Sequence, residues 1–254
     1  MYKLVVFDID GTLAVRWNEI PETTLETIRR LKERGIHCLM ATGRGSVAVE
    51  EMVRLTGIED YVALNGQYIF YGGRVTYKYV YPKEVTKRIA EICREVGCYY
   101  GFINERGYYI PDLDELRGKH GSPILTSVKT IDDLGEDEEV NQIVVFCEKE
   151  KYSYFDELKK DYIMTSWHTG GFDMHINTRS KAEGVREIAE DLGIGRDEIL
   201  CFGDGENDIE LLEYAGMGVA MGSAGEKVKK AADLVTEAAE ENGIYNICRK
   251  LGMI

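Results

Sequence analysis

The chain has 254 residues, of which 31 are Lys or Arg and 45 are Asp or Glu, so its formal net charge is -14 at pH 7. This charge excludes nucleic acids and anionic membrane surfaces as expected partners, and any anionic substrate needs a locally positive pocket. Six cysteines without a C-x-x-C pair, and the absence of an apolar run of about 18 residues, favour reduced thiols, no membrane span and a cytoplasmic location.

The first third of the chain alternates between strand and helix patterns. "KLVVFDI" predicts a strand buried on both faces, residues 20–35 predict a helix, and "IHCLMATGR" predicts a second buried strand. Residues 46–57 predict a helix, and "YVALNG" predicts a third strand. This order is typical of a parallel α/β sheet, because parallel neighbours need crossover helices.

The middle of the chain is rich in hairpin patterns instead. Residues 67–81 alternate around Gly72-Gly73 and predict a hairpin. Further elements are predicted in chain order as a helix at 83–97, a hairpin at 98–112, a strand at 140–148, a helix at 151–161 and a hairpin at 162–177. The acidic run "DDLGEDEEV" predicts a solvated loop. Hairpins with interspersed helices favour an α+β module with an antiparallel sheet.

The C-terminal part returns to strand and helix alternation. The predicted elements are a helix at 181–193, a strand at 198–204, a helix at 206–216, a strand at 217–222, a helix at 225–232, a strand at 233–236 and a helix at 241–252. We therefore predict a Rossmann-like α/β core made of residues 1–81 and 179–254, with an α+β insertion at about 82–178.

Polar residues terminate three of the predicted core strands, at the edge where parallel sheets bind ligands. The first strand ends in "DIDGT", the second in "TGR", and the strand at 198–204 ends in "GDGEND". Asp8, Asp10 and Asp204 would converge at this edge and repel one another. A hard divalent cation such as Mg²⁺ would relieve that repulsion, since it takes one or two carboxylates together with water and phosphate oxygens.

Four motifs in this order resemble those of the haloacid dehalogenase superfamily of phosphohydrolases: "DIDGT", "ATGR", Lys181 in "TRSKAEG", and "GDGENDIEL". The insertion between the second and third motifs resembles the type 2 cap of the Cof-like sugar-phosphatase branch. The resemblance covers the whole length and implies a Mg²⁺-dependent phosphatase that acts on a small phosphorylated metabolite, such as a sugar phosphate, as a monomer or small homo-oligomer.

The resemblance also implies a role for each matching residue. Asp8 would attack phosphorus and form an aspartyl-phosphate, and Asp10 would protonate the leaving group and then deprotonate water. The implied metal site comprises Asp8, the backbone carbonyl of Asp10, Asp204, and Asp208 as a direct or indirect partner. The implied phosphate-binding residues are Thr42, Gly43, Lys181 and Asn207.

Other interpretations of these residues stay open at this point. "DIDGTLAVRWNE" matches a calcium-binding loop in part, Thr42-Gly43-Arg44 is also a plausible helix cap, and an isolated Lys181 would ordinarily be solvated. The alternative functions are a phosphohexomutase of the same superfamily and a non-catalytic phospholigand-binding regulatory protein. His120 and His168, with aromatic neighbours in the insertion, are candidate substrate contacts.

Overall fold

The computed structural model describes residues 1–111, 128–135, 137–167 and 170–254. The chain divides into two compact units, one made of residues 1–44, 50–76 and 179–254, and the other of residues 45–49 and 77–178. The predicted assignment of residues 82–178 as a cap domain stays a prediction, and His120 and His168 lie outside the described residues. Among the helices that the structure describes, none combines the length and the apolar character needed to cross a bilayer.

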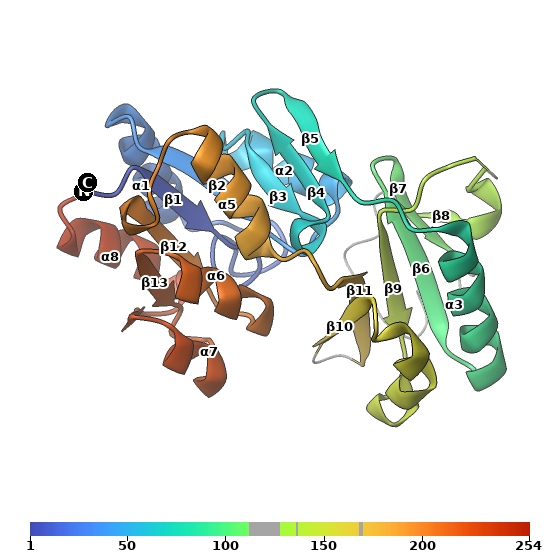
Figure 1. Ribbon diagram of the computed structural model, residues 1–254. Helices are drawn as coiled ribbons and strands as arrows, with labels where there is room; N and C mark the ends of the chain where they lie inside the picture. Colours follow the sequence, from blue (N-terminus) through green and yellow to red (C-terminus); the bar gives the residue numbers. More distant parts are fainter. Residues whose placement is uncertain (112–127, 136, 168–169) are drawn as a thin grey trace. The chain divides into compact units, whose positions relative to one another are not determined.

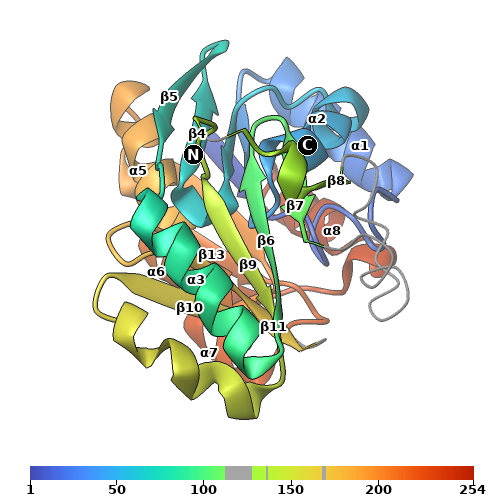
Figure 2. The ribbon, with the colours of Figure 1, turned by 90° about the vertical axis from the view of Figure 1, so that its right-hand side faces the viewer.

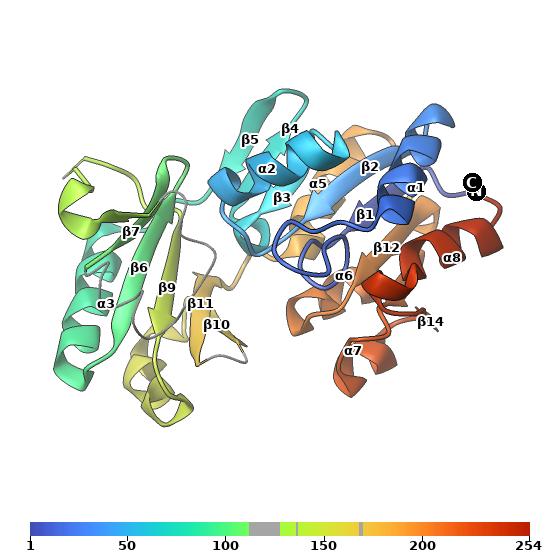
Figure 3. The same cartoon turned by 180° about the vertical axis from the view of Figure 1, so that it is seen from behind.

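The sheet of the first unit has eight strands in the order β14-β13-β12-β1-β2-β3-β4-β5 (Figures 1 and 3). Their bounds are β1 (Leu4–Phe7), β2 (His37–Ala41), β3 (Tyr61–Ala63), β4 (Tyr68–Tyr71), β5 (Arg74–Lys78), β12 (Ile199–Gly203), β13 (Met217–Ala220) and β14 (Leu234–Val235). The neighbours from β14 to β3 pair in parallel, and β4 pairs antiparallel with β3. The predicted α/β class with a parallel-sheet core is confirmed.

Helices cover both faces of this sheet. Helices α5 (Lys181–Asp191) and α6 (Ile209–Tyr214) lie on one face, and α1 (Glu22–Glu33), α2 (Ser46–Thr56) and α8 (Gly243–Lys250) on the other (Figures 1 and 3). Helix α7 (Glu226–Ala231) follows β13. Burial on both faces explains why β1 and β12 are apolar throughout, since every residue of both strands is buried.

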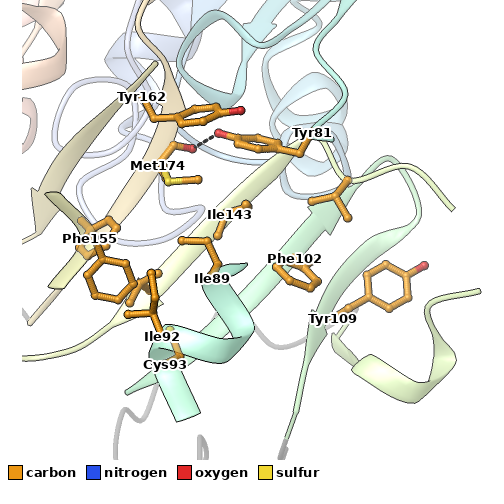
Figure 4. Close-up of a cluster of buried hydrophobic side chains, with 13 residues drawn as sticks. Tyr81, Ile89, Ile92, Cys93, Phe102, Tyr109, Ile143, Phe155, Tyr162 and Met174 are labelled. Atoms are coloured by element: carbon orange, nitrogen blue, oxygen red, sulfur yellow. Dashed lines mark hydrogen bonds between the residues drawn. The ribbon is translucent and has the colours of Figure 1, made fainter. Parts of the chain in front are cut away.

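The second unit contains a six-stranded sheet in the order β10-β11-β9-β6-β7-β8. Its strands are β6 (Tyr99–Asn104), β7 (Gly107–Ile110), β8 (Val128–Thr130), β9 (Gln142–Phe146), β10 (Tyr162–Trp167) and β11 (Gly171–Ile176). Helix α3 (Lys83–Val96) lies against one face of this sheet (Figure 2). Apolar side chains from the helix and the strands form its core, and within that core the Tyr81 hydroxyl donates to the Met174 carbonyl at 2.6 Å (Figure 4).

Two sequence expectations for this unit differ from the structure. The segment predicted as a helix at 151–161 instead lies mostly in a 3₁₀ segment, η4 (Lys149–Leu158). Only Phe155 of that segment is buried, so tertiary packing does not enforce an α-helical turn, and Tyr, Ser and Asp are weak helix formers. Strand β8 was not predicted, and it pairs in parallel with β7 in an otherwise antiparallel sheet.

Candidate active site

Two neighbouring strands bring acidic residues to the same edge of the first sheet. In the register of β1 and β12, Phe7 lies opposite Phe202, and their rings stack with centroids 5.7 Å apart. Asp8 follows Phe7 directly, and its backbone N–H donates to the Phe202 carbonyl at 3.0 Å. Asp204 comes two residues after Phe202. Because both strands end at this edge, the side chains of Asp8 and Asp204 both lie just beyond the apolar strands.

A tight turn follows Asp8 and depends on Gly11. Gly11 has a φ of +78°, and a Cβ atom there would lie 2.3 Å from Asp204 Oδ2, so neither the backbone conformation nor the space admits a side chain. Ile9, between the two aspartates, is fully buried. The Thr12 hydroxyl donates to Asp204 Oδ1 at 3.2 Å. The turn is thereby tied to β12.

A buried lysine joins two of the carboxylates. Lys181 Nζ donates to Asp8 Oδ1 and to Asp208 Oδ1, both at 2.6 Å, and the side chains are 1%, 7% and 1% exposed respectively. Asp208 Oδ2 accepts the backbone N–H groups of Asp204 and Gly205 at 3.0 and 2.9 Å. Both oxygens of Asp208 are therefore engaged, and its position orients Lys181 and the loop after β12.

The local charge balance at this cluster is negative. Burial and the neighbouring charge of Asp208 raise the pKa of Asp8 well above its ordinary value, although Lys181 opposes the shift. Burial and Asp208 likewise raise the pKa of Asp204 to about 6. Burial alone would lower the pKa of Lys181, but the carboxylates of Asp208 and Asp8 raise it, so this lysine stays charged. One cation does not compensate the carboxylates around it.

This donor set fits a metal ion. Asp8, Asp204 and Asp208 each offer a carboxylate oxygen, and these oxygens lie within 4.8 Å of one another. Hard oxygen ligands in a negatively charged pocket suit a divalent cation such as Mg²⁺. The raised pKa values of Asp8 and Asp204 also support a cation site, because they show that the two carboxylates are difficult to ionise without one. A cation bound at this place would favour their ionised forms.

Asp10 lies outside that three-carboxylate group and has a partner of its own. Arg44 Nε and Nη2 donate to Asp10 Oδ2 and Oδ1 at 2.9 and 2.7 Å, which is a bidentate pair. The guanidinium also donates to Asn18 Oδ1 at 2.8 Å and to the Trp17 carbonyl, and it lies 4.2 Å from the centroid of the Trp17 ring. The Arg44 side chain is 5% exposed, whereas that of Asp10 is 57% exposed.

The remaining predicted phosphate-binding residues lie near a buried asparagine. Thr42 follows β2, and its side-chain oxygen accepts the Arg44 N–H at 3.1 Å. A Cβ atom on Gly43 would lie 3.3 Å from both the Nδ2 and Oδ1 atoms of Asn65. Asn207 Nδ2 donates to Asn65 Oδ1 at 2.9 Å. Asn65 thus connects the loops that follow β2 and β12.

The position of Lys181 is set by the start of α5, because Lys181 is the first residue of that helix. Ser180 is the N-cap, and its side chain accepts the Glu183 N–H at 3.2 Å. Gly66, with a φ of +95°, packs so closely here that a Cβ atom would lie 2.1 Å from the Ser180 carbonyl oxygen. The loop after β3 therefore fixes where α5 begins, and with it the position of Lys181.

Sequence reasoning missed the contacts of three residues. Arg44 and Thr12 were part of recognised motifs but had no assigned role, and Asn65 was not considered. Asn65 follows β3, so the same attention to polar residues at strand ends would have found it. The partner of Arg44 depends on the path of residues 15–19, which no sequence pattern indicates.

Comparisons with known proteins match nearly the whole chain. A family model described as haloacid dehalogenase-like hydrolase matches residues 5–247. YkrA of Bacillus subtilis is 32% identical over 99% of this chain and 98% of its own length. The 5-amino-6-(5-phospho-D-ribitylamino)uracil phosphatase YitU of the same organism is 30% identical over 97% of this chain and 96% of its own.

A solved structure extends the likeness to the whole fold. The subclass IIB sugar phosphatase BT4131 is 30% identical and superposes with a TM-score of 0.86, covering 99% of this chain and 100% of its own. The predicted resemblance to Cof-like hydrolases is therefore confirmed. With its motifs in order and its whole length matched, this chain belongs to the haloacid dehalogenase-like hydrolase family.

Proposed function

We propose that this enzyme, a phosphatase of its family, hydrolyses a small phosphorylated metabolite through an aspartyl-phosphate on Asp8 with the help of Mg²⁺. The observation that carries the proposal is the contrast between two aspartates only two residues apart. Asp8 is buried and bonded to Lys181, whereas Asp10 is half-exposed and held by Arg44. Two carboxyl groups in such different surroundings suit two different chemical roles.

Asp8 is the proposed nucleophile. Its carboxylate attacks phosphorus, a P–O bond forms to Asp8, and the P–O bond to the leaving group breaks. Lys181, 2.6 Å from Asp8 Oδ1, holds that carboxylate in place and offers positive charge to the transferring group. Covalent transfer divides a difficult hydrolysis into two easier steps.

Asp10 is the proposed acid and base. In the first step it gives a proton to the leaving oxygen, and in the second it takes a proton from the water that attacks the phosphorus of the aspartyl-phosphate. Its exposed carboxyl group can meet both a leaving group and water. The bidentate contact with Arg44 orients that carboxyl group.

Mg²⁺ would be held by Asp8, Asp204 and the backbone carbonyl of Asp10. When bound, it would neutralise negative charge on the nucleophile and on the phosphoryl oxygens. Asp208 is better suited to an indirect role, since Lys181 and two backbone N–H groups already occupy its oxygens. Thr42, Gly43 and Asn207 are proposed to contact the phosphoryl group together with Lys181.

The proposed substrate class is a sugar phosphate or a similar phosphomonoester. Support comes from YitU and BT4131, whose names state a phosphorylated ribityl compound and sugar phosphates as their substrates. A cytoplasmic location, a monomeric or small homo-oligomeric state and the exclusion of nucleic acids and membranes remain predictions from the sequence. No observation favours the phosphohexomutase or the non-catalytic alternative.

A panel of phosphorylated metabolites tests the proposal. The full chain is incubated with each compound and Mg²⁺, released phosphate is measured, and the Asp8→Asn variant serves as the control for contaminating phosphatases. We expect phosphate release from sugar phosphates that the variant does not show. Isomerisation of a hexose 1-phosphate without phosphate release would establish the mutase instead, and no turnover of any compound would favour a binding protein.

A further inference from the structure

Two cysteines of the second unit, far along the chain from every residue assigned above, lie opposite each other at the end of a strand pair. We propose that Cys98 and Cys147 form a disulfide with each other when the protein meets a low-molecular-weight disulfide, and that this pair is a redox modification site. The proposal is independent of the phosphatase assignment, because it uses none of the active-site residues.

The strand register places the two residues face to face. Strands β6 and β9 are antiparallel, and the last pair of their ladder is Tyr99 with Phe146. Cys98 precedes Tyr99 and Cys147 follows Phe146, so the same register, continued by one position, sets them opposite each other. The Cys98 N–H donates to the Cys93 carbonyl at 2.8 Å, where α3 ends, so it is not used for a bond to Cys147.

A pair of residues opposed in this way is expected to have the spacing that a disulfide needs. Directly opposed residues of antiparallel strands have Cα atoms about 4.5 or about 5.5 Å apart, and both values fall inside the range of about 4.4–6.8 Å seen for disulfides. The side chains share a face as well: Tyr100 and Val145, each two residues away from one of the cysteines, pack in or against the same core cluster as both thiols.

The two thiols lie near each other. Each one affects the pKa of the other, and both are only partly buried, so a small oxidant has access to them. Cys93 lies near both but is fully buried in the core. The remaining three cysteines, Cys38, Cys201 and Cys248, are buried in the first unit.

The two thiols differ in one respect. Burial raises the pKa of both and the charge of Lys151 opposes that shift at both, but the interaction between the thiols lowers the pKa of Cys98 and raises that of Cys147. For Cys147, burial and the charge of Cys98 raise the pKa to about 12. Since the thiolate is the nucleophile, exchange begins at Cys98 and becomes faster as the pH rises.

The chemistry balances with one molecule of a disulfide such as oxidised glutathione. The Cys98 thiolate attacks one glutathione sulfur, and the other glutathione leaves as a thiolate. Cys147, after losing its proton, attacks Cys98 Sγ and displaces the second glutathione. The two protein thiols lose two electrons and two protons, and one glutathione disulfide becomes two thiols.

Peptide mapping of the native full chain tests the proposal directly. The protein is incubated with oxidised glutathione at about pH 8, remaining thiols are alkylated, and non-reduced peptides are identified by mass spectrometry. We expect one cross-linked peptide pair that joins Cys98 to Cys147, with the other four cysteines alkylated. We also expect an unfolding midpoint several degrees higher than that of the reduced protein, because the bond closes a loop of about 50 residues.

Variants define the order of events. Cys147→Ser should leave Cys98 carrying glutathione, Cys98→Ser should leave Cys147 as a thiol, and the matched control Cys248→Ser should cross-link like the parent chain. Alkylation of both thiols after prolonged oxidation, a link from Cys98 to Cys93, or a link that forms only in denaturant would each overturn the proposal. The mapping of the unmodified chain decides the matter even if a variant does not fold.

Discussion

Two ion pairs in the first unit involve aspartates from the same short turn, yet they differ in almost every physical respect. The Lys181 pair with Asp8 is buried and crowded by Asp204 and Asp208. The Arg44 pair with Asp10 has a buried cation and a carboxylate that is 57% exposed. In the first pair both charged groups are buried. In the second pair the carboxylate is in contact with water.

This difference suits the two roles proposed for the aspartates of this turn, nucleophilic attack by Asp8 and proton transfer by Asp10. A nucleophile benefits from a fixed position and from charges that act strongly in a dry environment. An acid and base must exchange protons with a leaving group and with water, which requires access. The following predictions are ways to break one pair while leaving the other intact.

The largest effect is expected for Asp8→Asn, which removes the proposed nucleophile. Turnover should fall by about 10³-fold or more, since an amide cannot replace the attacking carboxylate. The fold should persist, because the amide oxygen can still accept from Lys181 and the repulsion from Asp208 decreases. Phosphate release and thermal unfolding measure the two effects, and near-parental turnover would rule out the covalent mechanism.

Lys181→Met is expected to affect both catalysis and stability. It leaves buried carboxylates without their cation, which typically costs about 3–5 kcal/mol in the free energy of unfolding. Lys227→Met is the matched control, since Lys227 also lies 2.7 Å from a carboxylate, that of Glu206, but both side chains are about two-thirds exposed. That control should change stability by less than about 1 kcal/mol in denaturant unfolding. Equal effects at the two sites would contradict our account.

Arg44→Lys should break the orientation of Asp10 without touching the nucleophile. A lysine cannot make the bidentate contact, so we expect about 10-fold slower turnover of alkyl phosphates. The loss should be smaller for nitrophenyl phosphate, whose leaving group needs little protonation, and Asp10→Asn should show the same dependence more strongly. Arg54→Lys, at an exposed pair with Glu51, is the control. A loss that is equal for all leaving groups would exclude this role for Arg44.

The smallest effect concerns pH and Mg²⁺. The folded-state pKa of Asp204, about 6, lies above its ordinary value of 3.8, so the protonated form is favoured by folding. This contribution to stability is complete below about pH 4 and is lost as the pH rises through 6. Mg²⁺ competes with that proton, so it should raise the unfolding midpoint by a few degrees more at about pH 7.5 than at about pH 5. Asp204→Asn should abolish the difference, and an equal shift at both pH values in the parent chain would count against this site.

The sequence predicted most of the first unit because local and global signals agree there. Short apolar runs such as that of β1 must be buried on both faces, and the helices between them carry clear periodicity and end signals. The polar ends of β1, β2 and β12 pointed to one edge of the sheet, where the structure places Asp8 and Asp204 close together.

The rest depends on contacts that no local pattern carries. Arg44 meets Asp10 because the intervening chain returns past Trp17, and Asn65 meets Asn207 although 142 residues separate them. Strand β8 has only three residues, all partly exposed, so it shows no apolar alternation. The 3₁₀ geometry of η4 reflects weak packing rather than a sequence signal.

The close approach of Gly66 to Ser180 has a consequence for how this protein can be altered. The two residues lie on either side, along the chain, of residues 77–178, which belong to the second unit, and their contact leaves no room for a methyl group. After residues 77–178 the chain must return to this point, but nothing in the contact specifies the length or content of that segment. We therefore expect that another module can replace it, as long as the glycine and the start of α5 are kept.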